Sequence, residues 1–154
     1  MNRDEPFAKI VASLPIETFR PGESVLSAGA RSGRLLILKA GAVVVLKDNI
    51  EIAQVTESGA VFGELSALLD QPHAADVRAL TDASFYVADA KYLTTELDTL
   101  LHVARILARR IVNANKSVVE LKNELAAGHP GSKSGTILQR IEKILSIGGA
   151  SFET

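Results

Sequence analysis

The sequence predicts a mainly β protein with flanking helices, in which an antiparallel jelly roll or barrel of short strands precedes a long C-terminal helix. Three observations predict this fold class. A short segment of helical periodicity ends at Pro15. From Pro21 to Ala88 short apolar runs alternate with turns that contain glycine, proline, aspartate or asparagine. From Ala90 to Ala127 there is neither proline nor glycine, so long helices can form there.

The N-terminal helix is expected at Pro6–Leu14, because its apolar residues are spaced along one helical face. Pro21 and Gly22 then occupy the two central positions of a type II turn. Six strands are expected after this turn. They are Val25–Ser27, Arg34–Lys39, Ala42–Leu46, Ile50–Val55, Ala74–Leu80 and Ser84–Ala88.

Two helices are expected in the C-terminal part, at Thr94–Leu101 and Leu100–Leu125. Apolar residues of the second recur at alternating steps of four and three, which is a heptad repeat. These residues are Leu107, Ile111, Ala114, Val118, Leu121 and Leu125. Because a heptad stripe faces a partner helix in coiled coils, we predict a homodimer through this stripe. Packing of the helix on its own barrel is the alternative.

The charge balance gives no general basic surface for nucleic acid, because the formal net charge is −1. The long helix carries a basic run, for which a solvent-exposed face is favoured over a contact with a partner or nucleic acid. This run comprises Arg105, Arg109, Arg110 and Lys116. The chain has no cysteine, which excludes disulfides and thiolate metal sites. It shows no signal peptide and no apolar stretch long enough to span a membrane, so a cytoplasmic location is expected.

We expect one domain at residues 1–127, a linker at 128–135 and a short amphipathic helix with a tail at 136–154. Glycine and proline at residues 128–131 stop the long helix. Apolar residues at helical spacing predict the last helix, at Ile137–Ile147. This helix either docks on a protein partner or folds back on its own barrel, and the sequence does not decide between the two.

One stretch, residues 62–79, predicts a ligand site. Gly63 precedes a short helical run at Leu65–Leu69, and the start of a helix leaves backbone N–H groups without partners. These donors and the positive end of the helix dipole suit an anion. The carboxylate of Glu64 beside them suits hydroxyl groups. The combination predicts a cradle for a sugar phosphate, although Glu64 can also serve only to cap the helix.

This stretch and the order of elements resemble the cyclic-nucleotide-binding domain family over Ala8–Ala127. The family's phosphate-binding cassette has Phe-Gly-Glu-Leu, a short spacer that often ends in proline, and Arg-Ala/Ser/Thr-Ala. Here the cassette, residues 62–75, keeps that spacing without a gap. The resemblance implies that Glu64 binds the ribose 2′-hydroxyl and that Gly63 and Leu65 lie against the ribose and phosphate. It also implies that the Ala74 N–H binds the cyclic phosphate and that the long helix closes over the base. The expected ligand-binding residues are Phe62, Gly63, Glu64, Leu65, Ser66, His73, Ala74 and Ala75.

The sequence departs from the family pattern at His73, where the family places arginine. A guanidinium group pairs two phosphate oxygens with permanent charge, whereas histidine is shorter and mostly neutral at neutral pH. Loss of such a pair reduces affinity by roughly tenfold to several hundredfold. His73 is expected to be either a partly exposed residue at a strand entry or a weak phosphate donor.

The resemblance implies a non-enzymatic regulatory module. It would bind cAMP, cGMP or a related small anion and signal through its long helix to a protein partner. The alternative is a degenerate domain that binds no nucleotide and serves as a dimerisation or interaction scaffold. A third hypothesis, a metal or acid–base site, would use Glu64, His73 and Asp76, but no further histidine lies near them in sequence. No cofactor and no metal are therefore expected. Only 23 residues follow Gly131, so the winged helix-turn-helix domain of the related transcription factors is not expected.

Overall fold

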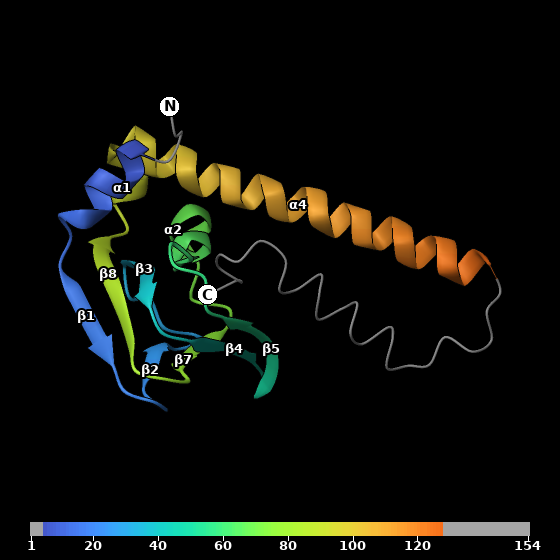
Figure 1. Ribbon diagram of the computed structural model, residues 1–154, viewed down its shortest axis with the longest axis horizontal. Coiled ribbons are helices and arrows are strands. Elements are labelled where there is room, and N and C mark those ends of the chain that lie inside the picture. The colour runs from blue at the N-terminus through green and yellow to red at the C-terminus, as the bar shows by residue number, and fades with distance from the viewer. Residues whose placement is uncertain (1–4, 128–154) are drawn as a thin grey trace.

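The computed structural model describes residues 5–127, which form two four-stranded antiparallel sheets with helices at one end (Figure 1). The first sheet has the order β1 (Ile16–Phe19), β8 (Ala83–Asp89), β3 (Arg34–Ala40) and β6 (Val61–Phe62). The second sheet has the order β2 (Ser24–Leu26), β7 (Asp76–Ala79), β4 (Val43–Lys47) and β5 (Ile50–Val55). The predicted antiparallel jelly roll is therefore confirmed.

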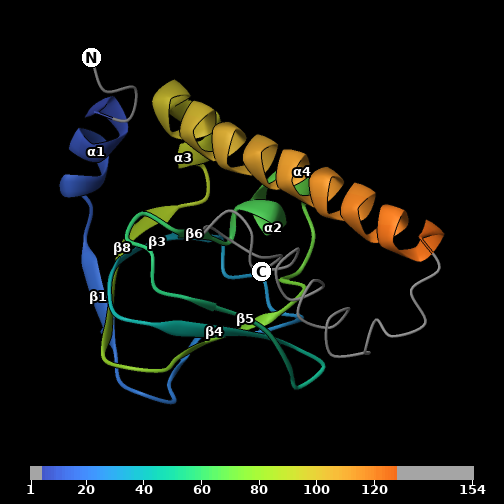
Figure 2. The ribbon, with the colours of Figure 1, turned by 45° about the vertical axis from the view of Figure 1, so that its right-hand side comes forward.

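Four helices complete the described part of the chain. They are α1 (Glu5–Ala12), α2 (Glu64–Leu69), α3 (Tyr92–Thr95) and α4 (Leu97–Ala126). Both views place α1 and the start of α4 beside the first sheet, with α2 beneath the middle of α4 (Figures 1 and 2). None of these helices has the length and apolarity needed to span a membrane.

The core lies between the two sheets and continues under α1 and α4. All four residues of Leu35–Leu38 in β3 are buried, because the second sheet covers one face and helices cover the other. Phe85 fixes the centre of this core with edge-to-face contacts to Phe19 and Phe62, at ring separations of 5.6 and 6.0 Å. This continuous apolar core stabilises the packing of the two sheets on one another and on the helices.

Two strands are missing from the sequence prediction, and one expected helix is wrong; the other boundaries differ by up to three residues. Strand β1 was not predicted, because it has only four residues and acquires its partner from β8, far along the chain. Strand β6 was not predicted either, because it has only two residues and pairs with β3, which is distant in sequence. The expected helix Thr94–Leu101 is wrong. The chain breaks at Glu96, whose backbone is extended (φ −113°, ψ 104°), and α4 then runs without interruption for 30 residues.

The predicted heptad stripe of α4 changes environment along the helix. Leu107 is partly buried and packs against the core, so the alternative of packing on the barrel holds for this residue. Farther along, Ile111 and Val118 are 62% and 55% exposed. Beyond its contact with α2 the helix extends away from the sheets (Figure 1). The side chain of Leu125, the linker at 128–135 and the helix expected within 136–154 lie outside the described residues. Pairing through the stripe stays a prediction.

Candidate functional site

The second residue of the cassette, Gly63, occupies a position that excludes any side chain. Gly63 joins β6 to α2 with a φ of 90°, in the left-handed region. A Cβ atom there would lie 2.3 Å from the carbonyl oxygen of Arg34 in β3. The absence of a side chain therefore lets the start of α2 lie directly against β3. This close approach fixes the direction in which the first residue of α2 leaves the sheet.

That first residue is Glu64, and its side chain is fully buried. Its Oε1 lies 3.7 Å from Nη1 of Arg110, a residue of α4 whose side chain is 16% exposed. A buried carboxylate is costly unless a positive group or hydrogen-bond donors compensate it. The Glu64–Arg110 ion pair therefore joins the cassette to the long helix by a charged contact.

Arg110 was missed as a site residue, because the basic run of α4 was expected to be a solvated face. Arg105, Arg109 and Lys116 are exposed as expected, but Arg110 points inward to Glu64. A signal for this was present in the sequence. Arg110 lies three residues after Leu107, and residues at this spacing share one helix face. Its partner could not be inferred, because α2 and α4 are distant in sequence.

His73 is buried, with 3% of its surface exposed, so its expected place as a partly exposed strand-entry residue is wrong. Its Nε2 lies 2.8 Å from Oγ of Ser32. Its backbone N–H donates to the carbonyl of Ala30, and its carbonyl accepts from the N–H of Gly29. The loop between β2 and β3 therefore holds His73 in place. Within residues 5–127, its Nδ1 has no hydrogen-bond partner.

A cavity of about 190 Å³ lies between this loop and α2, and His73 lines it together with Arg31 and Arg34. Both arginines are already paired with carboxylates. Arg31 binds Asp70 at 3.0 Å, and Arg34 binds Glu17 in β1. The permanent positive charge near His73 is therefore balanced by protein groups.

The other predicted ligand-binding residues divide between fully buried and half-buried positions of the cassette. Phe62 and Ala75 are fully buried core residues, whereas Leu65 and Ala74 are half-buried. In the half-buried Ser66, the hydroxyl donates to the carbonyl of Gln71 and stabilises the end of α2. The N–H of Ala74 has no backbone hydrogen-bond partner within residues 5–127, so it is available to an acceptor.

The structure does not bring together the three residues of the metal hypothesis. Oδ1 of Asp76 accepts a hydrogen bond from the N–H of Ala28 at 2.8 Å, which fixes the loop that precedes β3. Among the described residues, no group of three histidine, cysteine or acidic side chains has the arrangement of a metal site.

The sequence model of a protein family, the cyclic nucleotide-binding domain, matches residues 16–99, which is more than half of this chain. This chain belongs to that family. It is 34% identical over 70 residues to a cGMP-dependent protein kinase of Eimeria tenella, and the match covers 46% of this chain and 7% of the kinase. It thus spans only a small part of that relative. The family is a regulatory one, in which domains of this kind are typically not enzymes.

Solved structures agree with the fold. PKAR CBD2 with Sp-2Cl-cAMPS bound is 30% identical, with a TM-score of 0.58 and coverage of 74% of this chain and 75% of that one. The catabolite activator protein of Thermus thermophilus is 18% identical, with a TM-score of 0.63, and the match covers 77% of this chain and 59% of that chain. At that identity the second likeness concerns the fold alone.

Proposed function

We propose that this domain is a sensor that binds cAMP, cGMP or a related small anion in the cassette and signals through α4 to a protein partner. The observation that carries the proposal is the buried Glu64 carboxylate at the start of α2, with Arg110 of α4 at 3.7 Å. A ribose hydroxyl that donates to Glu64 changes the electrostatic balance of this pair. Because Arg110 belongs to α4, ligand binding would shift the preferred position of the helix.

Several cassette groups support the same ligand class. Gly63 allows a ligand to approach the backbone closely, with Leu65 beside it. The available N–H of Ala74 suits a phosphate oxygen. Nδ1 of His73 can donate a further hydrogen bond once the ring carries a proton there. In this assignment Glu64 binds the ribose, and the residues from His73 onward bind the phosphate.

Calorimetry of the full chain with cAMP and with cGMP tests the proposal. We expect saturable heat with at least one of them, and we expect Glu64→Gln to weaken the binding by at least tenfold, since the buried acceptor is lost. Glu51→Gln, an exposed glutamate of β5, is the matched control and should leave the affinity unchanged. The absence of heat at millimolar concentrations of both nucleotides would eliminate an ordinary signalling role for cAMP and cGMP.

The pH dependence of that affinity tests the contribution of His73. Histidine side chains gain a positive charge as the pH falls from 8 to 5.5. If the ring donates to the phosphate, the affinity should therefore increase over this interval, and His73→Gln should abolish the increase. An affinity that is constant over the same range would reject a protonated His73 as the substitute for the family's arginine.

The second candidate function is a dimerisation scaffold that binds no nucleotide. The exposed apolar residues Ile111 and Val118 favour it, since both belong to the predicted heptad stripe. Sedimentation of the ligand-free chain should then show a dimer, and Ile111→Asp should dissociate it. Val112→Asp is a matched control, because Val112 is 65% exposed but lies off the stripe. A monomeric ligand-free chain would count against this function.

A further inference from the structure

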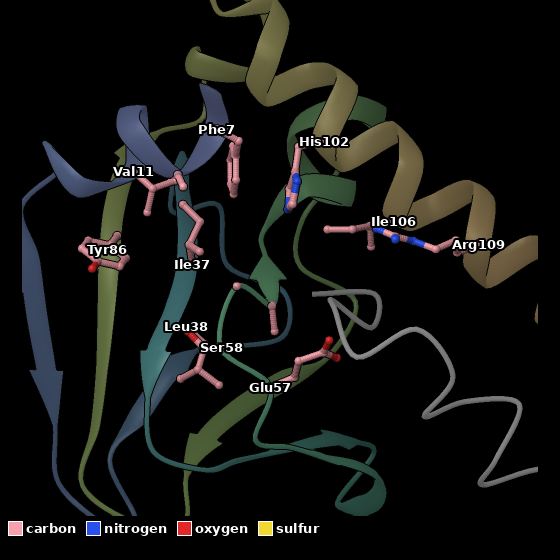
Figure 3. A pocket seen from close by; sticks show the side chains of 13 residues that line it. Phe7, Val11, Ile37, Leu38, Glu57, Ser58, Tyr86, His102, Ile106 and Arg109 are labelled. Atoms are coloured by element: carbon pink, nitrogen blue, oxygen red, sulfur yellow. The ribbon is translucent and has the colours of Figure 1, made fainter. Parts of the chain in front are cut away.

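A second cavity, of about 550 Å³, lies between α1, α4 and the first sheet (Figure 3). It is separate from the cassette, because none of residues 62–75 lines it. Its volume is in the range of pockets that hold small molecules, roughly 300–1,000 Å³. The α4 residues that line it are His102, Ile106 and Arg109, which share one helix face. Arg110, which binds Glu64, belongs to the neighbouring face.

The inner part of this cavity is apolar. Val11 of α1, Ile37 of β3 and Ile106 of α4 meet there, and at most 7% of each is exposed. The ring of Phe7 stacks on His102 with a centroid distance of 3.7 Å and an interplanar angle of 10°. Figure 3 shows Phe7, Ile37 and Ile106 arranged around the same space. These rigid walls suit an unbranched or planar apolar group.

The outer part of the cavity is polar. The guanidinium of Arg109 makes no ion pair with any residue of the described part, although Glu57 lines the same cavity. The two side chains extend from opposite walls (Figure 3). Ser58 and Tyr86 also line the cavity with hydroxyl groups that can donate or accept hydrogen bonds, and among the described lining residues Glu57 carries the carboxylate and Arg109 the permanent positive charge. The cavity therefore favours a ligand with acceptor oxygens at one end.

We propose that this cavity is a second ligand site for a small amphipathic carboxylate. The apolar body lies among Phe7, Ile37 and Ile106, and the carboxylate pairs with Arg109. A planar guanidinium binds a carboxylate with two parallel hydrogen bonds, which favours this group over an alcohol. The site requires no nucleotide in the cassette, so its test is independent of the proposed function.

Titration of the full chain with sodium octanoate, followed by amide NMR shifts, tests the site, with octylammonium as the probe of opposite charge. We expect saturable shifts at Ile37, Ile106 and their neighbours with octanoate only. Arg109→Ala should weaken the affinity for octanoate by about tenfold, which is the loss expected for one charged pair. Arg105→Ala is the matched control, since Arg105 is exposed on α4 but does not line the cavity.

Glu57→Gln adds a second variant that does not depend on the loss of Arg109. Removal of the carboxylate from the cavity wall should strengthen octanoate binding, by about twofold. Equal affinity of wild type and Arg109→Ala, shifts that map outside the cavity, or stronger binding of octylammonium would each overturn the proposal.

Discussion

The two halves of the cassette are held by different forces. In the half that we propose for the ribose, residues 63–65, Gly63 lies against the Arg34 carbonyl, and the fully buried Glu64 faces Arg110. In the half that we propose for the phosphate, residues 73–75, His73 is held by a hydrogen bond to Ser32 and by backbone bonds to the preceding loop. The first half depends on close packing and buried charge, so few substitutions are compatible with the fold. The second depends on individual hydrogen bonds, each of which contributes about 1 kcal/mol, so we expect a substitution there to cost less stability.

Replacement of Gly63 should have the largest effect on stability. In Gly63→Ala the new Cβ would contact the Arg34 oxygen at 2.3 Å in a left-handed conformation, so we expect a loss of more than about 3 kcal/mol in unfolding free energy. Gly29→Ala shares the positive φ, but its Cβ would meet no atom of residues 5–127 within 4 Å, so it should lose only about 1–2 kcal/mol. Urea unfolding measures both values. Equal losses of unfolding free energy in the two variants would show that the close contact of Gly63 with β3 is not what restricts this position.

Removal of Arg110 should have the next largest effect. Arg110→Ala leaves the buried carboxylate of Glu64 without this cation, and we expect a loss of about 2–4 kcal/mol in unfolding free energy. The double variant Glu64→Gln/Arg110→Ala should recover part of that loss, because the buried charge is gone. Arg105→Ala, at an exposed position of the same helix, is the control. An Arg110→Ala protein as stable as wild type would mean that the ion pair does not stabilise the contact between α2 and α4.

The smallest effect should come from the hydrogen bond of the phosphate half. Ser32→Ala removes the hydroxyl that lies 2.8 Å from Nε2 of His73, and the expected loss is about 1 kcal/mol. Ser27→Ala is the control, because among the described residues its hydroxyl bonds only another exposed serine, Ser24, and its loss should change stability by less than about 0.5 kcal/mol. Thermal unfolding compares them. A loss as large as that of Arg110→Ala would contradict the difference between the two halves.

The strands with strong local signals were predicted well. Ile50–Val55 matches β5 residue for residue, because turn residues precede and follow a clear β run. Strands β1 and β6 were missed, since they are short and exist only through pairing with distant strands. The spacing of the cassette placed Gly63 and Glu64 correctly at the start of α2.

Two properties of the site required the tertiary structure. The burial of His73 depends on the loop that contains Ser32, which is 41 residues earlier in the chain. The inward position of Arg110 depends on where α4 crosses α2. A local pattern carries neither piece of information. The heptad stripe is a different case. Ile111 and Val118 are exposed in a single chain, and their pairing with a second chain stays a prediction.

Calorimetry of His73→Arg with cAMP tests most directly whether the phosphate half lacks only a permanent charge. We expect the affinity to increase by at least tenfold over wild type, since a guanidinium can pair with two phosphate oxygens. The gain should disappear when Glu64→Gln is added, because the ribose half would then be lost. Circular dichroism establishes that the variants are folded. A folded His73→Arg protein that binds cAMP no better than wild type would contradict the account.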